Sequence, residues 1–306
     1  MDKDEKIVKL KLDVIFKRVF GNSDNEHIIA SLISMLLEIP RESIKKIYIN
    51  NVELTPEYFD RKFSRLDLKL EVDNRIVNVE MQVNREPDFK ERTLFYWSKL
   101  FSEDLKSGEE YNELKQTICI NIINFNLFDY QDYHSHFKVM EKDRQEVLSD
   151  KLSIHFFELK KINKYRKNRP MEDWLNLINA ETEGDLMAIQ QSTNIKEVKD
   201  TIVMLRELSA DEKVRQEAYY REKRLHDEAT ALGYARREGK AEGIAEGRAE
   251  GRAEGRAEGR AEGRVEGRAE GIAEGRKKGK AEGIAEIAEK MRRLGYTEEQ
   301  IKTLLD

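Results

Sequence analysis

The stretch "RLDLKLEVDNRIVNVEMQV", residues 65–83, decides the fold because it has the pattern of two β-strands joined by a tight turn. Apolar and polar residues alternate on both sides of Asp73-Asn74, which predicts strands with one apolar and one polar face. The two apolar sets share a face if the turn has two residues and Val72 pairs with Arg75. The pattern therefore predicts an antiparallel hairpin and its register.

The polar face of this hairpin holds the candidate site. The register pairs Asp67 with Glu80 and places their Cβ atoms about 5 Å apart. Two like charges at this distance destabilise a hairpin and raise the pKa of one carboxyl, unless a cation lies between them. Mg²⁺ prefers carboxylate and water ligands, and it can activate water while neutralising a phosphate oxygen. The alternative is an ordinary solvated hairpin face. The same register pairs Arg65 with Gln82 and Lys69 with Asn78.

The segments around the hairpin predict an α/β core over residues 1–165. Amphipathic helices are expected at 12–20 and 23–37, before the hairpin, and at 88–108, after it. Further strands are expected at 44–54, 116–125 and 152–159, with a helical segment between the last two. This order predicts a mixed sheet flanked by helices.

Composition excludes some classes of function. The chain has 306 residues, of which 39% are hydrophobic and 38% charged, which suits one sizeable core with a polar appendage. It shows neither a long apolar stretch nor a signal-like start, which predicts a cytoplasmic protein without a membrane partner. The net charge of -5 gives no general attraction to nucleic acid, and DNA contacts would need local basic patches.

Two other features are interpreted as structural. Cys119 lies in the apolar run "TICINII", where a lone cysteine is expected to fill the core. His134 and His136 have no third ligand nearby in sequence, and they are interpreted as loop surface and not as a zinc site.

Several motifs together resemble a known family. The run of Asp67 followed by Glu80-Met81-Gln82 resembles the PD-(D/E)XK nuclease motif. The opening Asp13-x-x-Phe16-Lys17-x-x-Phe20-Gly21, the helix "RTLFYWSKLFSEDLKSGEEY" and the closing "FFELKK" are similar to the Rpn family of recombination-promoting nucleases, also described as transposases. The resemblance covers about residues 8 to 165.

The resemblance implies a PD-(D/E)XK nuclease-like sheet and a Mg²⁺-dependent DNA endonuclease that acts in recombination or in a mobile-element, transposase context. Asp67 and Glu80 would bind the Mg²⁺, and Asp13 on the first helix would supply a further acid. The alternative is a catalytically silent DNA-binding or scaffold protein that retains the nuclease fold.

One departure from the motif matters, because Gln82 stands where the motif has lysine. Its neutral amide can orient water but carries no positive charge. Lys69 and Arg65 are the expected substitutes on the same face, although they could simply pair with nearby glutamates. Lys17 and Arg92 are more distant candidates. The residues expected to contact the DNA backbone are Arg65, Lys17, Arg92 and Lys99, and the alternative for the last two is the solvated side of a helix.

The C-terminal part of the chain is repetitive. A helical extension is expected at 166–238, Ala-Glu-Gly-Arg repeats at 239–283, and a short helical pair at 284–306 that uses Gly295 and a cap at 297–300. Twelve glycines recur at every fourth position in the repeats, and each costs a helix about 1 kcal/mol relative to alanine. Two readings stay open: a disordered or partly helical spacer, or a helix that packs on another copy and forms a homo-oligomer.

Overall fold

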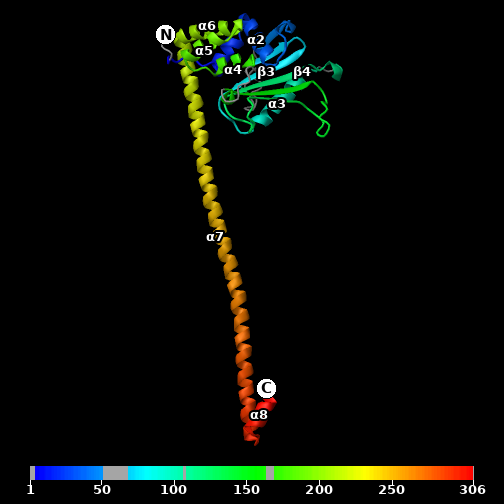
Figure 1. Cartoon of the computed structure of the whole chain (residues 1–306), viewed down its shortest axis with the longest axis vertical. Helices are drawn as coiled ribbons and strands as arrows, with labels where there is room; N and C mark the ends of the chain where they lie inside the picture. Colours follow the sequence, from blue (N-terminus) through cyan, green and yellow to red (C-terminus); the bar gives the residue numbers. More distant parts are fainter. Residues whose placement is uncertain (1–3, 51–67, 106–107, 163–168, 306) are drawn as a thin grey trace. The chain divides into compact units, whose positions relative to one another are not determined.

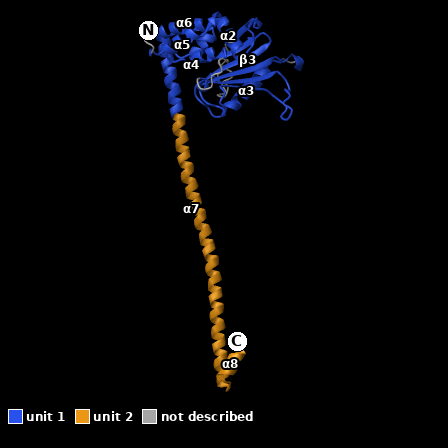
Figure 2. Ribbon diagram, viewed as in Figure 1, with its two compact units in different colours: residues 1–230 blue, residues 231–306 orange. Residues whose placement is uncertain are grey.

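The computed structural model describes residues 4–50, 68–105, 108–162 and 169–305. Two compact units divide the chain, residues 1–230 and residues 231–306 (Figure 2). The predicted hairpin lies in the first unit.

A mixed six-stranded sheet forms the centre of the first unit, in the order β1-β2-β3-β4-β6-β5. The hairpin β2-β3 is antiparallel and β1 extends it, whereas β3, β4 and β6 run parallel and β5 returns antiparallel to β6. The mixed sheet confirms the predicted fold class. The strands are β1 (Ile47–Asn50), β2 (Leu68–Val72), β3 (Arg75–Gln82), β4 (Gln116–Ile123), β5 (His134–Phe137) and β6 (Leu152–Glu158).

The hairpin has the predicted register. Val72 pairs with Arg75, and Lys69 pairs with Asn78. Asp73 adopts a positive φ of 54°, a left-handed conformation that a tight two-residue turn requires. Its carboxylate Oδ1 accepts hydrogen bonds from the backbone N–H groups of Lys45 (3.0 Å) and Lys46 (3.1 Å). The turn is therefore anchored to the chain that leads into β1.

Helices cover both faces of this sheet (Figure 1). The apolar face of the hairpin packs in the main core, which also contains buried side chains of α1, α2, α4 and α6. The other face meets α3, whose Phe89 packs with Cys119, Ile154 and Phe156 in a smaller apolar cluster. The helices of this unit are α1 (Asp13–Phe20), α2 (Glu26–Leu36), α3 (Phe89–Glu103), α4 (Met171–Asn179), α5 (Glu183–Ser192) and α6 (Lys196–Ala210), with 3₁₀ turns at Ser23–Asn25, Arg41–Ser43, Tyr111–Glu113 and Leu159–Lys161.

The expectation of a helical segment between the last two strands is wrong. Residues 126–151 contain turns and the short strand β5, and no helix. His134 and His136 lie on strand β5 and not in a loop, which corrects that part of the expectation, although His136 is exposed at the surface and His134 is half-buried. This edge strand is held by backbone pairing to β6 and lacks the apolar alternation by which a strand is detected.

Helix α7 (Glu212–Arg293) is one continuous helix, and α8 (Glu298–Leu305) follows it. The first turns of α7 belong to the first unit, where Val214 and Ala218 are buried. In the second unit, Gly295 has a φ of 89° just after the end of α7. The side chains of Thr297 and Gln300 then cap α8, as predicted. No helix in the described parts of the chain is long and apolar enough to cross a bilayer.

Candidate active site

Glu80 lies near the carboxyl end of β3, on the face covered by α3. Asn78, Glu80 and Gln82 are every second residue of the strand and therefore share one face. The backbone of Glu80 pairs with Asn121 on β4. Only 6% of Glu80 is exposed. A carboxylate this buried needs polar partners, since an unpaired charge in the interior costs several kcal/mol.

Arg92 from the first turns of α3 is one such partner. Its Nη2 donates hydrogen bonds to Oε1 of Glu80 (3.0 Å) and to Oε1 of Gln82 (3.1 Å). Its Nη1 donates to the carboxylate of Glu86. The guanidinium also lies 5.0 Å from the centre of the Phe89 ring, within cation–π range. Arg92 therefore joins the helix to two consecutive polar positions of β3.

Gln82 is held in one orientation. Its Nε2 donates to the backbone oxygen of Asn84 (2.9 Å) and to Oε1 of Glu86 (3.0 Å). This leaves the amide oxygen to accept from Arg92. The amide thus acts as a bridge between the end of the strand and the guanidinium.

Further polar side chains lie between α3 and the sheet. Asn121 donates from Nδ2 to the backbone oxygen of His155 (3.1 Å), and its Oδ1 lies 3.4 Å from Oγ1 of Thr93. Burial raises the pKa of Tyr96, and the negative charge of Glu80 adds to the effect. Tyr96 therefore stays a neutral phenol at physiological pH. Cys119 is buried, and burial likewise raises the pKa of its thiol, as expected for a side chain that fills the core.

The oxygen atoms of Glu80 and Asn78 are of the chemical type that binds hard cations such as Mg²⁺. Glu80 offers a carboxylate, and Oδ1 of Asn78 is buried without a hydrogen-bond partner in the part of the chain that the structure describes. Among the described residues, no three His, Cys, Asp or Glu side chains gather as metal ligands. Glu86 brings a second carboxylate into this network through Arg92 and Gln82, and Asp67 directly precedes β2 in the sequence. Asp67 and Arg65, with the predicted Asp67–Glu80 pair, lie outside the described residues.

The other predicted site residues are placed in different parts of the unit. Lys69 pairs with Asn78 and shares its face of the hairpin, two residues along the chain from Asp67, the predicted partner of Glu80. Asp13 on α1 accepts a hydrogen bond from Arg221 of α7. Lys99 lies one turn from Glu103 on α3, with 3.6 Å between the charged groups. Lys17 lies on α1, one turn after Asp13.

Two contacts of this region could not be read from the sequence. The Arg92–Gln82 bond joins a helix to a strand, and Glu86, which holds both residues, lies in the connection between them. Asn84 donates from Nδ2 to the backbone oxygen of Leu225 (2.7 Å), which brings α7 to the end of β3. The sequence does hold one indication of these contacts, which is Gln82. A neutral residue at the position of the motif lysine suggests that another helix or strand supplies the positive charge.

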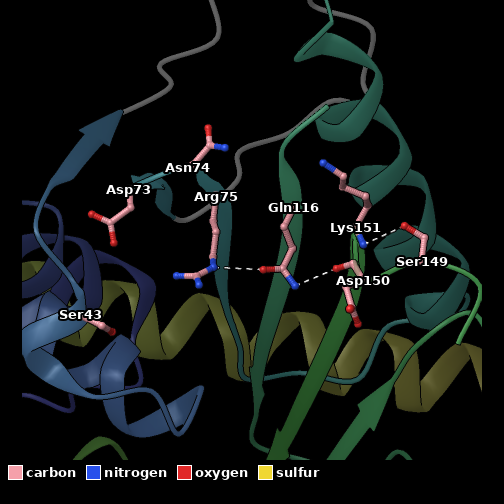
Figure 3. A pocket seen from close by; sticks show the side chains of 8 residues that line it. All are labelled: Ser43, Asp73, Asn74, Arg75, Gln116, Ser149, Asp150 and Lys151. Carbon is pink, nitrogen blue, oxygen red and sulfur yellow. Dashed lines mark hydrogen bonds between the residues drawn. The ribbon is translucent and has the colours of Figure 1, made fainter. Parts of the chain in front are cut away.

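A separate cavity of about 460 Å³ lies at the amino ends of the parallel strands (Figure 3). Arg75 donates from Nε to Oε1 of Gln116 (3.1 Å), and Gln116 donates to the backbone oxygen of Asp150 (2.8 Å). Ligands of open α/β sheets generally bind at the carboxyl ends of the strands. Glu80 and Gln82 lie toward that opposite end of β3, so the cavity is not part of the candidate active site.

Helices on both faces of a mixed sheet, with polar groups gathered near the carboxyl end of β3, define a nuclease-like α/β core. A family model described as "PD-(D/E)XK nuclease family transposase" matches residues 10–235, and the chain belongs to this family. The match confirms the family resemblance and supports a nuclease- or transposase-related role. No curated protein and no solved structure gave a match.

Proposed function

We propose that the protein is a Mg²⁺-dependent DNA endonuclease that acts in recombination or transposition. The observation that carries the proposal is the buried carboxylate of Glu80 on β3, which Arg92 of α3 joins to Gln82 in a member of a nuclease family. A buried acid among oriented polar groups is costly for stability and is typical of functional sites.

Asp67 and Glu80 would hold the ion, which when bound supplies a Lewis acid and an activated water. Gln82 has its amide oriented by Asn84 and Glu86, and its side-chain oxygen can accept a hydrogen bond from a water in addition to the one from Arg92. Lys69 lies on the same face of the hairpin and is a candidate for the cation that replaces the motif lysine. The candidates for binding the DNA backbone are Arg65, Lys17, Arg92 and Lys99.

The second candidate function is a catalytically silent DNA-binding or scaffold protein. One observation favours it: Gln82 replaces the motif lysine, and Arg92 already pairs with Glu80 in the structure. In this reading the ion pair is a structural element of the fold. For either function, a homo-oligomer formed through the C-terminal region is part of the proposal.

Nicking of a supercoiled plasmid, with Mg²⁺ and with a chelator, tests the nuclease. Glu80→Gln keeps a hydrogen-bond acceptor for Arg92, whereas alanine would leave the guanidinium without it. The matched control is Glu71→Gln on β2, because Glu71 points to the same face but pairs with Lys115 (3.0 Å). We expect Glu80→Gln to abolish nicking and Mg²⁺-induced thermal stabilisation, and Glu71→Gln to keep both. Full activity of Glu80→Gln would refute the site, and a wild-type chain that binds DNA without nicking it would favour the silent protein.

A further inference from the structure

We propose that Arg92 of α3 supplies the positive charge that the motif lysine would have carried at position 82, and that its guanidinium binds the scissile phosphate of DNA. The inference rests on the proposed function and assigns a further catalytic residue to the same site. Arg92 lies ten positions after Gln82 in the sequence and on another element.

The guanidinium of Arg92 lies where the charge of the motif lysine would lie. Nη2 of Arg92 lies 3.1 Å from the side-chain oxygen of Gln82 and 3.0 Å from Oε1 of Glu80. The charge therefore lies at the tip of the side chain of residue 82 and next to the acid that precedes it by two positions. In the family motif (D/E)XK, the lysine follows the acid by the same interval. Gln82 and Arg92 together provide the reach and the charge that one lysine would provide.

The guanidinium is also held in place. Glu86 accepts from Nη1 of Arg92 and from Nε2 of Gln82, which fixes both side chains in one network. The Phe89 ring lies against the guanidinium. Nε of Arg92 is buried and has no hydrogen-bond partner in the described part of the chain. A cation fixed before the substrate arrives stabilises developing phosphate charge without reorganisation.

The chemistry of the group suits a phosphodiester. A guanidinium presents several N–H donors in a plane and binds phosphate oxygens. Glu80 and Gln82 accept from Nη2 of Arg92 and Glu86 accepts from Nη1, so the second N–H of Nη1 is the donor that would reach a phosphate oxygen. Two neighbouring cations contact other groups: Lys90 lies over the Phe128 ring (4.7 Å), and Arg85 reaches the backbone oxygen of Asn126 (3.5 Å). Arg92 contacts both polar residues of the motif on β3.

Relocation of the charge tests the inference. Arg92→Gln should lower the cleavage rate by about 100-fold or more, the usual cost of losing one donor to the transition state. Adding Gln82→Lys returns a cation to the strand, and the double variant should regain most of the lost rate. Arg92→Lys keeps a charge on α3 and provides a folded comparison if Arg92→Gln is unstable. Lys90→Gln, on the same helix, is the matched control and should cleave like the wild type.

Binding of a short DNA duplex in Ca²⁺ gives a readout that does not depend on cleavage. Arg92→Gln should bind more weakly than the wild type, and the double variant should regain affinity. A wild-type chain that binds DNA but never cleaves it would refute the proposed function. The DNA affinities of Arg92→Gln and of the double variant would then decide whether Arg92 binds the phosphate. Arg92→Gln that cleaves and binds like the wild type would overturn the inference alone. A double variant with wild-type melting temperature that stays as inactive and as weakly bound as Arg92→Gln would also overturn it.

Discussion

Arg221 of α7 donates a hydrogen bond from Nε to Oδ1 of Asp13 on α1, at 2.6 Å and across 208 positions of the sequence. A second pair, Arg18 with Glu217, joins the same two helices at 2.7 Å. Because Val214 is buried in the main core, the start of α7 is part of the nuclease unit. The family match, which ends at residue 235, includes these turns.

The first prediction concerns this boundary. A chain that ends at Tyr234 keeps every contact between α1 and the start of α7 and should fold. A chain that ends at Ala210 loses two buried side chains of α7, Val214 and Ala218, and should be less stable by about 2 kcal/mol or more. Urea unfolding of the two truncated chains measures the difference. Equal stability would mean that α7 does not support the core.

The second prediction separates two roles of Asp13. If its role is to pair with Arg221, then Asp13→Asn and Arg221→Gln should each cost about 1 kcal/mol, and the double variant should cost less than their sum. Unfolding of the four chains provides this cycle. Nicking should survive in all the variants. Loss of nicking in Asp13→Asn with normal nicking in Arg221→Gln would instead support Asp13 as an active-site acid.

The sequence predicts most reliably where one physical requirement dominates. The hairpin register follows from alternation, because a shift of one residue would turn Val77 and Val79 out of the core. The cap of α8 follows from the local chemistry of Thr297 and Gln300. Strand β5 was missed because its four residues are held by pairing with β6, and "HSHF" has no apolar face to reveal it.

The candidate site was predictable in part. Alternation placed Lys69, Glu80 and Gln82 on one face, since the face of a strand residue depends only on its position in the chain. The contact of Arg92 with that face depends on how α3 packs on the sheet, which spacing within one element cannot reveal. The sequence indicates Arg92 as a DNA-binding residue and as a more distant candidate for the cation that replaces the motif lysine, but it does not indicate the direct contacts of Arg92 with Glu80 and Gln82.

The third prediction concerns stability in acid. On β5 and β6, His155 bonds to His134 (3.0 Å between nitrogens) and to Ser153 (2.9 Å), and the ring of His136 stacks on it. Burial, followed by the nearby His136, His134 and Lys138, lowers the pKa of His155 from 6.5 to about 3. The folded state therefore keeps this imidazole neutral at pH values at which the unfolded chain protonates it.

Because the unfolded chain then binds more protons, the contribution of His155 to the free energy of unfolding should be constant well above pH 6.5 and should fall as the pH drops from 6.5 toward 3, by up to about 1.4 kcal/mol per pH unit. His155→Gln should reduce this slope, whatever its effect on stability at neutral pH. The control His226→Gln changes a histidine whose side chain is 81% exposed and should keep the wild-type slope. Urea unfolding at pH 5 and pH 7 gives the comparison, and equal slopes for both variants would contradict the assignment.

The fourth prediction concerns the glycines of α7. From Gly239 to Gly283, a Cβ atom added at any of the repeat glycines meets nothing within 4 Å among the residues that the structure describes. No contact within the described residues therefore requires glycine there, although each one weakens the helix. Replacing Gly251, Gly255 and Gly259 by alanine should stabilise the helix by about 1 kcal/mol per site, visible as higher helicity on heating in circular dichroism. Gly295→Ala is the contrasting control, since a φ of 89° strains an alanine and should lower the stability of the end of the helix.

The same triple variant distinguishes the two readings of the tail. A spacer gains helicity and keeps its oligomeric state, because nothing packs on the glycines. A helix that packs along a second copy needs the close approach that glycine allows, and three methyl groups should weaken that association even as the helix itself gains stability. Light scattering at low and high salt measures the result, because contacts between glutamate and arginine stripes also weaken as ionic strength rises. An oligomer equally stable in the wild type and the triple variant would mean that the glycine positions are not its interface.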